Sequence, residues 1–207
     1  MRIQVLVLAK RPVPGRVKTR LCPPCTPEQA ATIAAAAIED TLDAVDASRA
    51  HARTLVADGV LQPRPGWTLV NQCHGDLDER LAHAFTTTAK SRVATVLIGM
   101  DTPQVTGKLL DRAAAALSTA DAALGMAADG GWWALALRRP ADAEALRGIP
   151  TSRDDTGVRT LEALRSKGMK VAALPVLRDV DTADDALEVA AIRPHGRFAK
   201  ALRGVVR

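Results

Sequence analysis

Aromatic side chains are scarce in this chain: its 207 residues include three Trp, two Phe and no Tyr. Proteins that bind single-stranded nucleic acid stack the bases on exposed aromatic rings, so this composition disfavours a nucleic-acid partner. The sequence also lacks an apolar run of the ~18 residues that a membrane span requires. Its first residues enter an expected strand without the pattern of a signal peptide. We therefore expect a cytoplasmic protein with no membrane span.

Cysteine is also rare, and an odd number of three is a poor basis for a disulfide framework. Cys22 and Cys25 have CxxC spacing, and Cys73 with His74 could complete a set of four zinc ligands. The two pairs lie far apart in the sequence. We therefore interpret them as ordinary thiols rather than as a zinc or redox centre.

Several familiar catalytic motifs are absent. The first loop lacks the GxxxxGKS/T spacing of a P-loop, and no GxGxxG follows the first expected strand, which disfavours a dinucleotide-binding Rossmann fold. There is no nucleophile elbow centred on Ser, and the four histidines show no HExxH grouping. Covalent catalysis is therefore not indicated, and a direct in-line attack organised by a metal and by cations is favoured.

The charge balance favours an anionic ligand. The chain has a formal net charge of +5, and 47% of its residues are apolar, which suits a single α/β domain with a sizeable core. Outside one loop and the C-terminal segment, the cations are spread along the chain. We therefore favour a small phosphorylated substrate over an extended polyanion.

The most informative stretch begins with the apolar run Val5–Ala9, which is typical of a strand buried on both faces of a parallel sheet. The loop that follows contains two prolines, Gly15 and five cations: Lys10, Arg11, Arg16, Lys18 and Arg20. A stiff basic loop at the carboxyl edge of a sheet is how α/β proteins bind phosphate. A solvated loop without a ligand is the alternative, but cations so close together repel one another unless an anion is near.

Strand and helix signals alternate along the rest of the chain, which predicts a mostly parallel sheet flanked by helices. Thr26 with Gln29, and Thr182 with Asp185, have the spacing that starts a helix. The strands beside Gly130 can add an antiparallel pair. Further strands are expected at 53–57, 67–71, 93–99, 122–126, 132–137 and 171–174, and further helices from about residues 76, 106 and 156.

These elements are expected to form one domain over residues 1–192. The remaining segment, 193–207, is basic and carries Arg197, Lys200, Arg203 and Arg207. It predicts either a terminal amphipathic helix or a solvated basic tail, and we favour the solvated tail.

Four acidic residues stand at the ends of expected strands or in the loops after them: Asp101, Asp129, Asp179 and Asp181. The carboxyl ends of parallel strands meet at one edge of a sheet, which is also the edge of the basic loop. Carboxylates beside phosphate-binding cations suit Mg²⁺ (or Mn²⁺), with Lys18 and Arg20 holding the phosphate oxygens. Each acid taken alone could instead shape a turn or cap a helix.

Five motifs occur in a specific order. They are Ala9-Lys10-x-Pro12-x-x-Gly15-x-Val17-Lys18-Thr19-Arg20-Leu21, Gly75-Asp76-Leu77-x-Glu79-Arg80-Leu81, Gly99-x-Asp101-Thr102-Pro103, Asp129-Gly130-Gly131 and Asp179-Val180-Asp181-Thr182. From residue 3 to about 190 the chain thereby resembles a bacterial family of glycosyltransferase-A-like transferases that is labelled as a domain of unknown function. That family is similar to the 2-phospholactate guanylyltransferases and, more distantly, to the molybdopterin guanylyltransferases.

The resemblance implies a single-domain nucleotide-diphospho-sugar transferase fold of the GT-A, Rossmann-like type. It implies nucleotide-phosphate binding by the first loop, through Ala9, Lys10, Gly15, Lys18, Thr19 and Arg20. The implied metal ligands are Asp101, Asp179 and Asp181, and the implied substrate contacts are Gly75, Asp76, Asp129, Gly130 and Gly131. Lys18 and Asp101 are the expected catalytic residues. The first loop departs from the better-known nucleotidyltransferases in lacking their GxxxR pattern.

Our leading hypothesis is a metal-dependent nucleotidyltransferase, in which a small phosphorylated acceptor attacks the α-phosphate of a nucleoside triphosphate. The polycationic loop fits the roughly four negative charges of a triphosphate better than the two of a nucleotide sugar. A glycosyltransferase that uses a nucleotide-diphosphate sugar is the first alternative, and a non-catalytic nucleotide-binding protein is the second. The sequence does not specify the nucleobase or the acceptor, and it is compatible with a homodimer.

Overall fold

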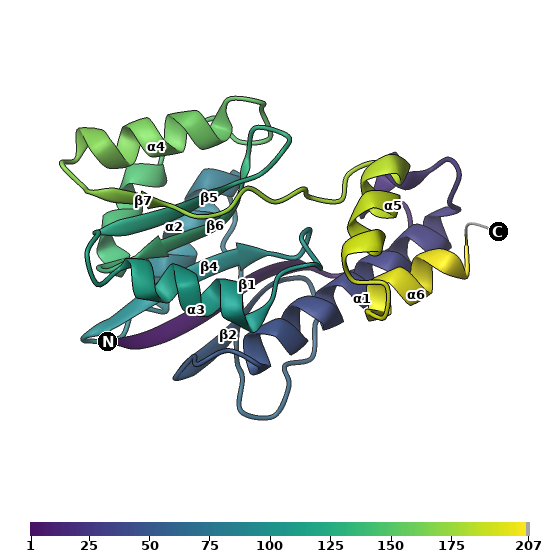
Figure 1. The fold of residues 1–207 in the computed structure, drawn as a ribbon, viewed down its shortest axis with the longest axis horizontal. Coiled ribbons are helices and arrows are strands. Elements are labelled where there is room, and N and C mark those ends of the chain that lie inside the picture. Colours follow the sequence, from purple (N-terminus) through teal and green to yellow (C-terminus); the bar gives the residue numbers. More distant parts are fainter. Residues whose placement is uncertain (206–207) are drawn as a thin grey trace.

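The computed structural model describes residues 1–205 and has a mixed α/β fold, in which a seven-stranded sheet is flanked by helices (Figure 1). The strands coincide closely with the apolar runs of the sequence. Their bounds are β1 (Arg2–Lys10), β2 (Ala52–Asp58), β3 (Thr68–Asn71), β4 (Val93–Gly99), β5 (Ala122–Met126), β6 (Trp132–Leu137) and β7 (Val171–Ala173).

The order of strands in the sheet is β3-β2-β1-β4-β6-β5-β7. Among these strands β6 alone runs against its neighbours, since it pairs antiparallel with both β4 and β5. The mostly parallel sheet and the antiparallel pair beside Gly130 are therefore confirmed. The carboxyl ends of β1, β2 and β4 lie at one edge, because these three strands are parallel.

The helices are α1 (Pro27–Asp46), α2 (Leu77–Thr87), α3 (Gly107–Ala116), α4 (Thr156–Ser166), α5 (Ala183–Ile192) and α6 (Arg197–Arg203), with short 3₁₀ helices η1 (Thr19–Leu21) and η2 (Pro140–Leu146). Both expected capping boxes are present, Thr26 with Gln29 at the start of α1 and Thr182 with Asp185 at the start of α5. Within residues 1–205, none of the helices combines the length and the apolar character that a membrane span needs.

Two hydrophobic cores lie on opposite faces of the sheet. One face packs against α1 and α3, and Val7 lies in this core. The other face packs against α2, η2 and α4, and it contains Leu6, Phe85 and Leu164, each 0% exposed. Because Leu6 and Val7 are adjacent in β1, this strand is buried on both faces, as its unbroken apolar run predicts.

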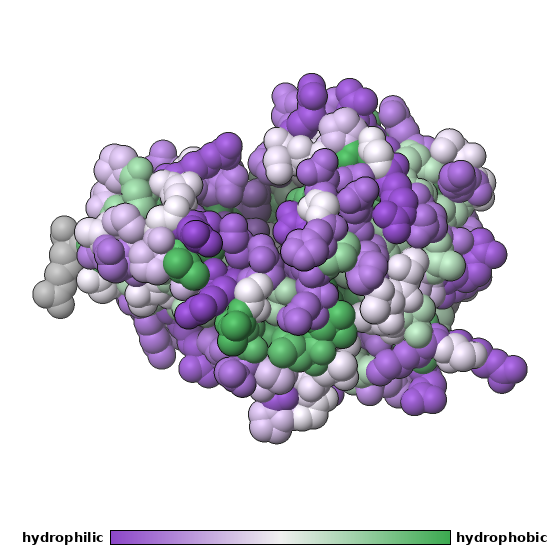
Figure 2. Space-filling model, turned by 180° about the vertical axis from the view of Figure 1, so that it is seen from behind, coloured by the Kyte–Doolittle hydropathy of each residue, from purple (hydrophilic) through white to green (hydrophobic). Residues whose placement is uncertain are grey.

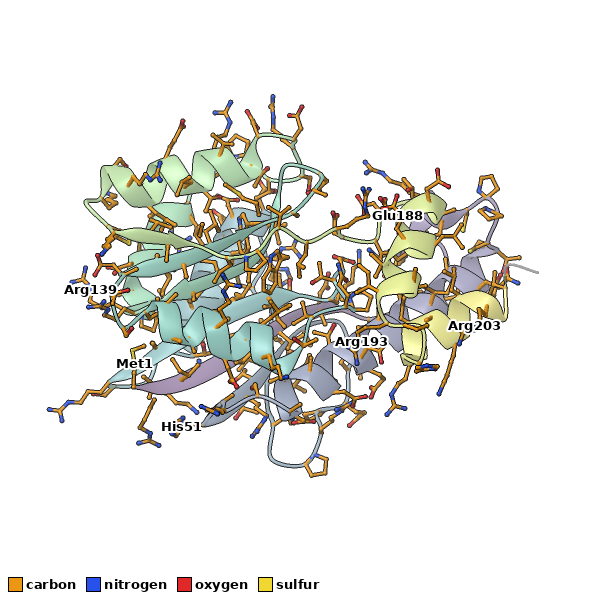
Figure 3. All side chains as sticks on the ribbon, viewed as in Figure 1. Met1, His51, Arg139, Glu188, Arg193 and Arg203 are labelled. Atoms are coloured by element: carbon orange, nitrogen blue, oxygen red, sulfur yellow. The ribbon has the colours of Figure 1, made fainter. Side chains whose placement is uncertain are left out.

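A third core lies beyond the carboxyl edge of the sheet, in a group of short segments that we call the helical lobe. The lobe consists of η1, the first half of α1, α5 and α6 (Figure 1), and Leu21, Ile33, Val189 and Phe198 are buried inside it. Arg193 ties the lobe to the loop after β4 (Figure 3). Its Nη1 donates to the carbonyl oxygens of residues 103 and 105, at 2.9 and 3.2 Å.

The expectation of a solvated tail after residue 192 is wrong. Helix α6 buries Phe198 and Leu202 against the lobe. The carboxylate of Asp40 on α1, which is only 2% exposed, accepts the backbone N–H groups of Arg197 and Phe198 at 3.0 and 2.9 Å. These bonds satisfy donors at the start of α6 that no residue near it in the sequence caps. Arg207, the last residue of the expected tail, lies outside the described residues.

The replacement Phe198→Ala is expected to lower the free energy of unfolding by about 3 kcal/mol, because it leaves a cavity in the core of the lobe. Urea denaturation followed by circular dichroism measures this loss. Lys200→Ala on the same helix is the matched control, since Lys200 is exposed, and it should change stability by less than about 0.5 kcal/mol. Equal losses for the two variants would contradict the docked helix.

Candidate active site

A cavity of about 720 Å³ opens at the carboxyl ends of β1, β2 and β4. Seen from behind, the surface is hollowed between the smaller and the larger part of the molecule, and hydrophilic residues dominate the rim (Figure 2). Six cations and six carboxylates line the cavity: Lys10, Arg16, Lys18, Arg20, Arg80 and Arg153, and Asp58, Asp101, Asp129, Asp154, Asp179 and Asp181. Its volume is within the range of ordinary small-molecule sites.

Most of the residues that the sequence predicts for the site line this cavity. They are Ala9, Lys10, Lys18, Thr19, Arg20, Asp101, Asp129, Gly131, Asp179 and Asp181. Gly15, Gly75, Asp76 and Gly130 are not among its lining residues. Gly15 has a φ of +72°, and a Cβ added there would meet no atom within 4 Å, so this glycine serves the turn of the basic loop. Asp76 occupies the N-cap position of α2 and is exposed there.

Lys18 is the most buried cation of the basic loop, with a side chain only 7% exposed. Its backbone is left-handed (φ 49°, ψ 38°) at the start of η1. The Nζ forms an ion pair with Asp101, donates to the carbonyl oxygen of Val180, and lies 3.8 Å from Oδ1 of Asp181. Arg20 contacts the other oxygen of Asp181, with 3.0 Å between Nη1 and Oδ2. Lys10 and Arg16 form no ion pair with any residue of the described chain.

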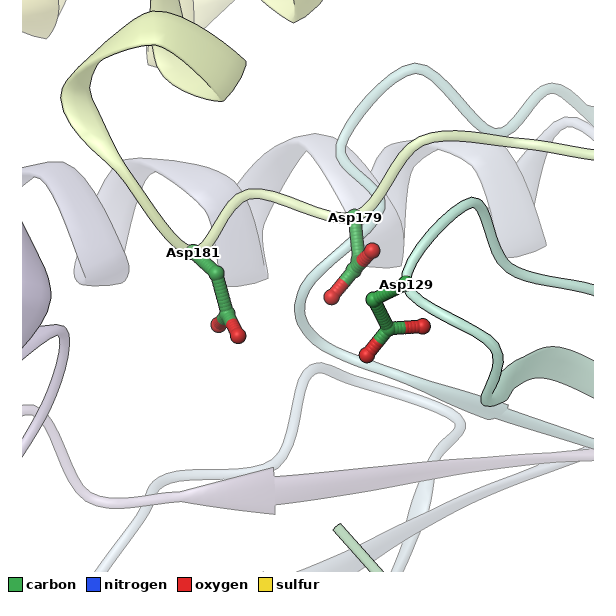
Figure 4. A group of neighbouring side chains, drawn as sticks. All are labelled: Asp129, Asp179 and Asp181. Atoms are coloured by element: carbon green, nitrogen blue, oxygen red, sulfur yellow. The ribbon is translucent and has the colours of Figure 1, made fainter. Parts of the chain in front are cut away.

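Three carboxylates form a compact group in the cavity (Figure 4). One oxygen from each of Asp129, Asp179 and Asp181 lies within 4.8 Å of the others. Asp179 and Asp181 belong to the metal set that the sequence predicts. The third predicted ligand, Asp101, forms an ion pair with Lys18 instead, and Asp129 is the third member of the group. Within residues 1–205, no other three side chains of Cys, His, Asp or Glu lie close enough together to hold a metal ion.

The electrostatics of Asp179 reflect this crowding. Burial, and then the nearby charge of Asp129, raise the pKa of Asp179 to about 6. The carboxylate is thus partly buried next to like charges, where a bound cation would relieve the repulsion. Carboxylate oxygens are the donors that Mg²⁺ and Mn²⁺ prefer, so the residues present fit such an ion.

The Asp129 turn is built by close backbone packing. Oδ1 of Asp129 accepts the backbone N–H of Gly131 at 2.8 Å, and Gly157 N–H donates to the carbonyl of Gly130, also at 2.8 Å. Gly130 has a φ of +90°, and a Cβ there would come within 1.8 Å of the carbonyl oxygen of Asp154. Gly130 therefore fixes the turn against the loop before α4, and it does not itself face the cavity.

Asp58, Gln72 and Arg80 also line the cavity, and the sequence predicted no role for them. Gln72 donates through Nε2 to the carbonyls of Ala9 (3.2 Å) and Val56 (3.1 Å), so it joins the ends of β1 and β2. Its Oε1 accepts from Arg80 at 3.1 Å, and Arg80 also lies 3.7 Å from Asp58. The motif that contains Arg80 was the available signal, but spacing alone does not say which of its residues reach a cavity.

The two adjacent tryptophans have different surroundings. Trp133 is buried, and its Nε1 donates to the carbonyl of Pro175 at 2.9 Å, which holds the segment after β7 against the sheet. Trp132 is half-buried and lines the cavity together with Trp133. The thiols lie elsewhere: Cys25 is buried in the helical lobe, where burial and the neighbouring Cys22 raise the pKa of the Cys25 thiol.

A family of bacterial proteins described as "Uncharacterized protein conserved in bacteria (DUF2064)" matches residues 30–153, which is more than half of the chain. No curated protein matches the chain. Among solved structures, a protein from Desulfovibrio desulfuricans G20 described as a candidate nucleotide-diphospho-sugar transferase is 25% identical, with a TM-score of 0.86 over 99% of this chain and 95% of that one.

Two further solved proteins share the fold at lower identity. Rv0371c from Mycobacterium tuberculosis H37Rv is 23% identical, with a TM-score of 0.59 over 92% of this chain and 99% of that one, and it has also been solved as a complex with manganese. The CMP:2-keto-3-deoxy-manno-octonic acid synthetase in complex with CTP is 12% identical, with a TM-score of 0.59 over 94% and 99%. The chain thus has the fold of nucleotide-diphospho-sugar transferases.

Gly130→Ala is expected to lower the free energy of unfolding by about 2 kcal/mol or more, since the new Cβ would collide with backbone in a left-handed conformation. Gly148→Ala is the matched control. Gly148 has a φ of +78°, and a Cβ added there would meet no atom within 4 Å, so only the left-handed strain of about 1 kcal/mol applies. Equal losses in urea denaturation would contradict the packing of the Asp129 turn.

Asp179→Asn is expected to raise the melting temperature at pH 7.5 in metal-free buffer. The folded-state pKa of about 6 exceeds the ordinary value near 3.9, so the ionised form disfavours the fold and the free energy of unfolding falls as pH rises from about 4 to about 6. Discounted for partial exposure, the gain is on the order of 1 kcal/mol, or about 2–4 °C.

Asp184→Asn, on an exposed residue of α5, is the control for Asp179→Asn and should not raise the melting temperature, since it removes a favourable acid from the first turn of the helix. The measurement is a thermal melt with EDTA at several pH values between 4 and 8. An Asp179→Asn variant that keeps the wild-type pH dependence in this range would show that Asp179 is not the group responsible.

Proposed function

We propose that this chain, which belongs to the bacterial family whose model matches residues 30–153, is a divalent-metal-dependent nucleotidyltransferase. It would transfer a nucleotidyl group from a nucleoside triphosphate to a small phosphorylated acceptor. The observation that carries the proposal is the juxtaposition of the basic loop and the group of three carboxylates in one cavity. A ligand that suits both is an anionic polyphosphate together with a divalent cation.

The unpaired cations of the loop support a triphosphate. Lys10 and Arg16 line the cavity and have no carboxylate partner within the described chain, so their charge is available to an anionic ligand. Arg20 and Lys18 add two more cations beside Asp181. Charge-assisted contacts of this kind are the strongest hydrogen bonds that a protein can offer to phosphate.

The proposed metal ligands are Asp129, Asp179 and Asp181, and Asp101 stands at the same edge of the cavity beside Lys18. A Mg²⁺ or Mn²⁺ ion bound there would neutralise charge on the phosphates and on the departing pyrophosphate. The manganese complex of Rv0371c and the CTP complex of the synthetase support this assignment by analogy of fold.

In the proposed reaction, an oxygen of the acceptor phosphate attacks the α-phosphorus. A new P–O bond forms as the bond between the α-phosphorus and the α–β bridging oxygen breaks, and pyrophosphate leaves with the electron pair of that bond. Lys18 and Arg20 would hold the phosphates in line, so that positioning and electrostatic stabilisation supply most of the catalysis. Arg153 and Trp132 line the cavity beside the Asp129 turn, where the acceptor would bind.

A glycosyltransferase that uses a nucleotide-diphosphate sugar is the second candidate. It is favoured by the likeness to the Desulfovibrio desulfuricans protein, whose description names that class. The two functions share a metal and a fold, and they differ in the group that is transferred. A related open choice is the nucleobase, for which the guanylyltransferase resemblance makes GTP the first nucleotide to test.

The experiment is a thermal-shift panel of GTP, CTP, ATP, UTP, UDP-glucose and GDP-mannose, each with and without Mg²⁺. We expect a metal-dependent rise of melting temperature with one nucleoside triphosphate, since a ligand that binds only the folded state stabilises it by mass action. A rise confined to a nucleotide sugar would replace the proposal by the glycosyltransferase. No metal-dependent rise with any of them would overturn both.

Asp181→Asn is expected to weaken binding of the metal–nucleotide complex tenfold or more, because it removes a carboxylate from the proposed metal site. Isothermal titration calorimetry with Mg²⁺ and the nucleotide selected by the panel measures the change. Asp184→Asn, three positions along and exposed on α5, is the matched control and should bind like the wild type. Equal affinities for both variants would count against the metal site.

A further inference from the structure

Lys18 occupies a position that is unusual for a lysine. Its side chain is more than nine-tenths buried, and three protein oxygens surround the ammonium: a carboxylate oxygen of Asp101, one of Asp181 and the carbonyl oxygen of Val180. A lysine loses rotamer freedom and hydration on burial, so it adopts such a place only where negative charge compensates. In this structure the ammonium is the counter-ion of the carboxylates.

The oxygens around the ammonium come from two segments that are fastened to each other. Val180 N–H donates to the carbonyl oxygen of Asp101 at 2.9 Å, and the Val180 side chain is 0% exposed in the core of the helical lobe. The side-chain amide of Gln104 donates to the carbonyl of Arg178 just before them. The ammonium therefore lies in a pre-formed cradle, rather than in a chance contact between flexible side chains.

Asp181 cannot bind the Lys18 ammonium and a divalent ion equally well at the same time. Asp181 belongs to the group of three that fits a metal, and it is also shared with Lys18 and Arg20. An ammonium beside that group lowers its affinity for Mg²⁺ or Mn²⁺ through charge repulsion, since the Lys18 Nζ lies 3.8 Å from Oδ1 of Asp181. By contrast, Lys10 and Arg16 line the cavity and form no ion pair with a carboxylate of the described chain, so their charges are available to an anion.

We propose that Lys18 is a resident counter-ion that keeps divalent metal out of the nucleotide-free site. The phosphates of an arriving nucleotide would draw the Lys18 ammonium away from Asp101 and Asp181, which would leave Asp129, Asp179 and Asp181 free to hold the metal. Nucleotide and metal bind with positive coupling, and by thermodynamic linkage each raises the affinity for the other by the same factor. The inference rests on the proposed function, because it concerns the same site.

The test is titration of the free protein with Mn²⁺, in which electron paramagnetic resonance reports unbound metal. Wild-type protein is expected to bind Mn²⁺ weakly, and at least roughly tenfold more tightly when saturated with a non-hydrolysable nucleoside triphosphate. The neutral variant Lys18→Met should bind Mn²⁺ at least roughly tenfold more tightly than the wild type without nucleotide. In this variant, added nucleotide should give little further gain.

Lys10→Met is the matched control. It removes the same charge from the same cavity, but Lys10 is exposed and has no carboxylate contact in the described chain. Its affinity for Mn²⁺ without nucleotide should therefore rise less than twofold. Circular dichroism verifies the fold of each variant, and Lys18→Gln replaces Lys18→Met if the latter does not fold.

The outcomes separate this inference from the proposed function. If the wild type binds a nucleoside triphosphate but Lys18→Met and Lys10→Met bind Mn²⁺ alike, the counter-ion role is wrong and the nucleotidyltransferase proposal stands. If no nucleotide binds but Lys18→Met still gains affinity for Mn²⁺ over the control, the lysine does exclude metal and the proposed substrate is wrong. Tight Mn²⁺ binding by the nucleotide-free wild type would overturn the inference outright.

Discussion

Helix α1 takes part in two hydrophobic cores at once, and the geometry of the cavity depends on this. One side of the helix, with Ala34, Ile38 and Leu42, packs on the sheet. A second side, with Ala30 and Ile33, packs inside the helical lobe. Residues three and four apart share a helix face, so these two apolar stripes run along one rigid rod. The distance between the sheet edge and the lobe is thereby set by packing rather than by a hinge.

That constraint explains how residues distant in the sequence meet. Lys18 precedes η1 in the lobe, Asp101 follows β4 in the sheet, and Asp181 precedes α5. Each would be an ordinary surface charge on its own element. Because the two bodies are held together by α1 and by the bonds of Arg193, the three charges meet at one side of the cavity, where Lys18 pairs with Asp101 and lies 3.8 Å from Asp181. Pre-organisation of this kind fixes the segments that carry these charges, so that only side chains have to move when a ligand binds.

Local signals in the sequence predicted most of the fold. The cap at Thr26 and the buried run of β1 were correct because each depends on residues within a few positions. Helix α6 was missed because the carboxylate that accepts its first N–H groups belongs to Asp40, far away in α1. The site shows the same limit. Topology alone brings the acids that follow strands to one edge, but whether Asp101 or Asp129 completes the group of three depends on the backbone packing of Gly130.

The composition of the helical lobe has a consequence for the order of folding. Its core joins Leu21 and Ile33 to Val180, Val189 and Phe198, which come from the last part of the chain. During synthesis, β1, η1 and α1 emerge early, whereas α5 and α6, which complete the core of the lobe, leave the ribosome last. The apolar side of α1 that faces the lobe must stay uncovered until then, which is the stage at which such a chain is most exposed to aggregation and to chaperones. A wall of the cavity is thus completed only when nearly all of the protein has been made.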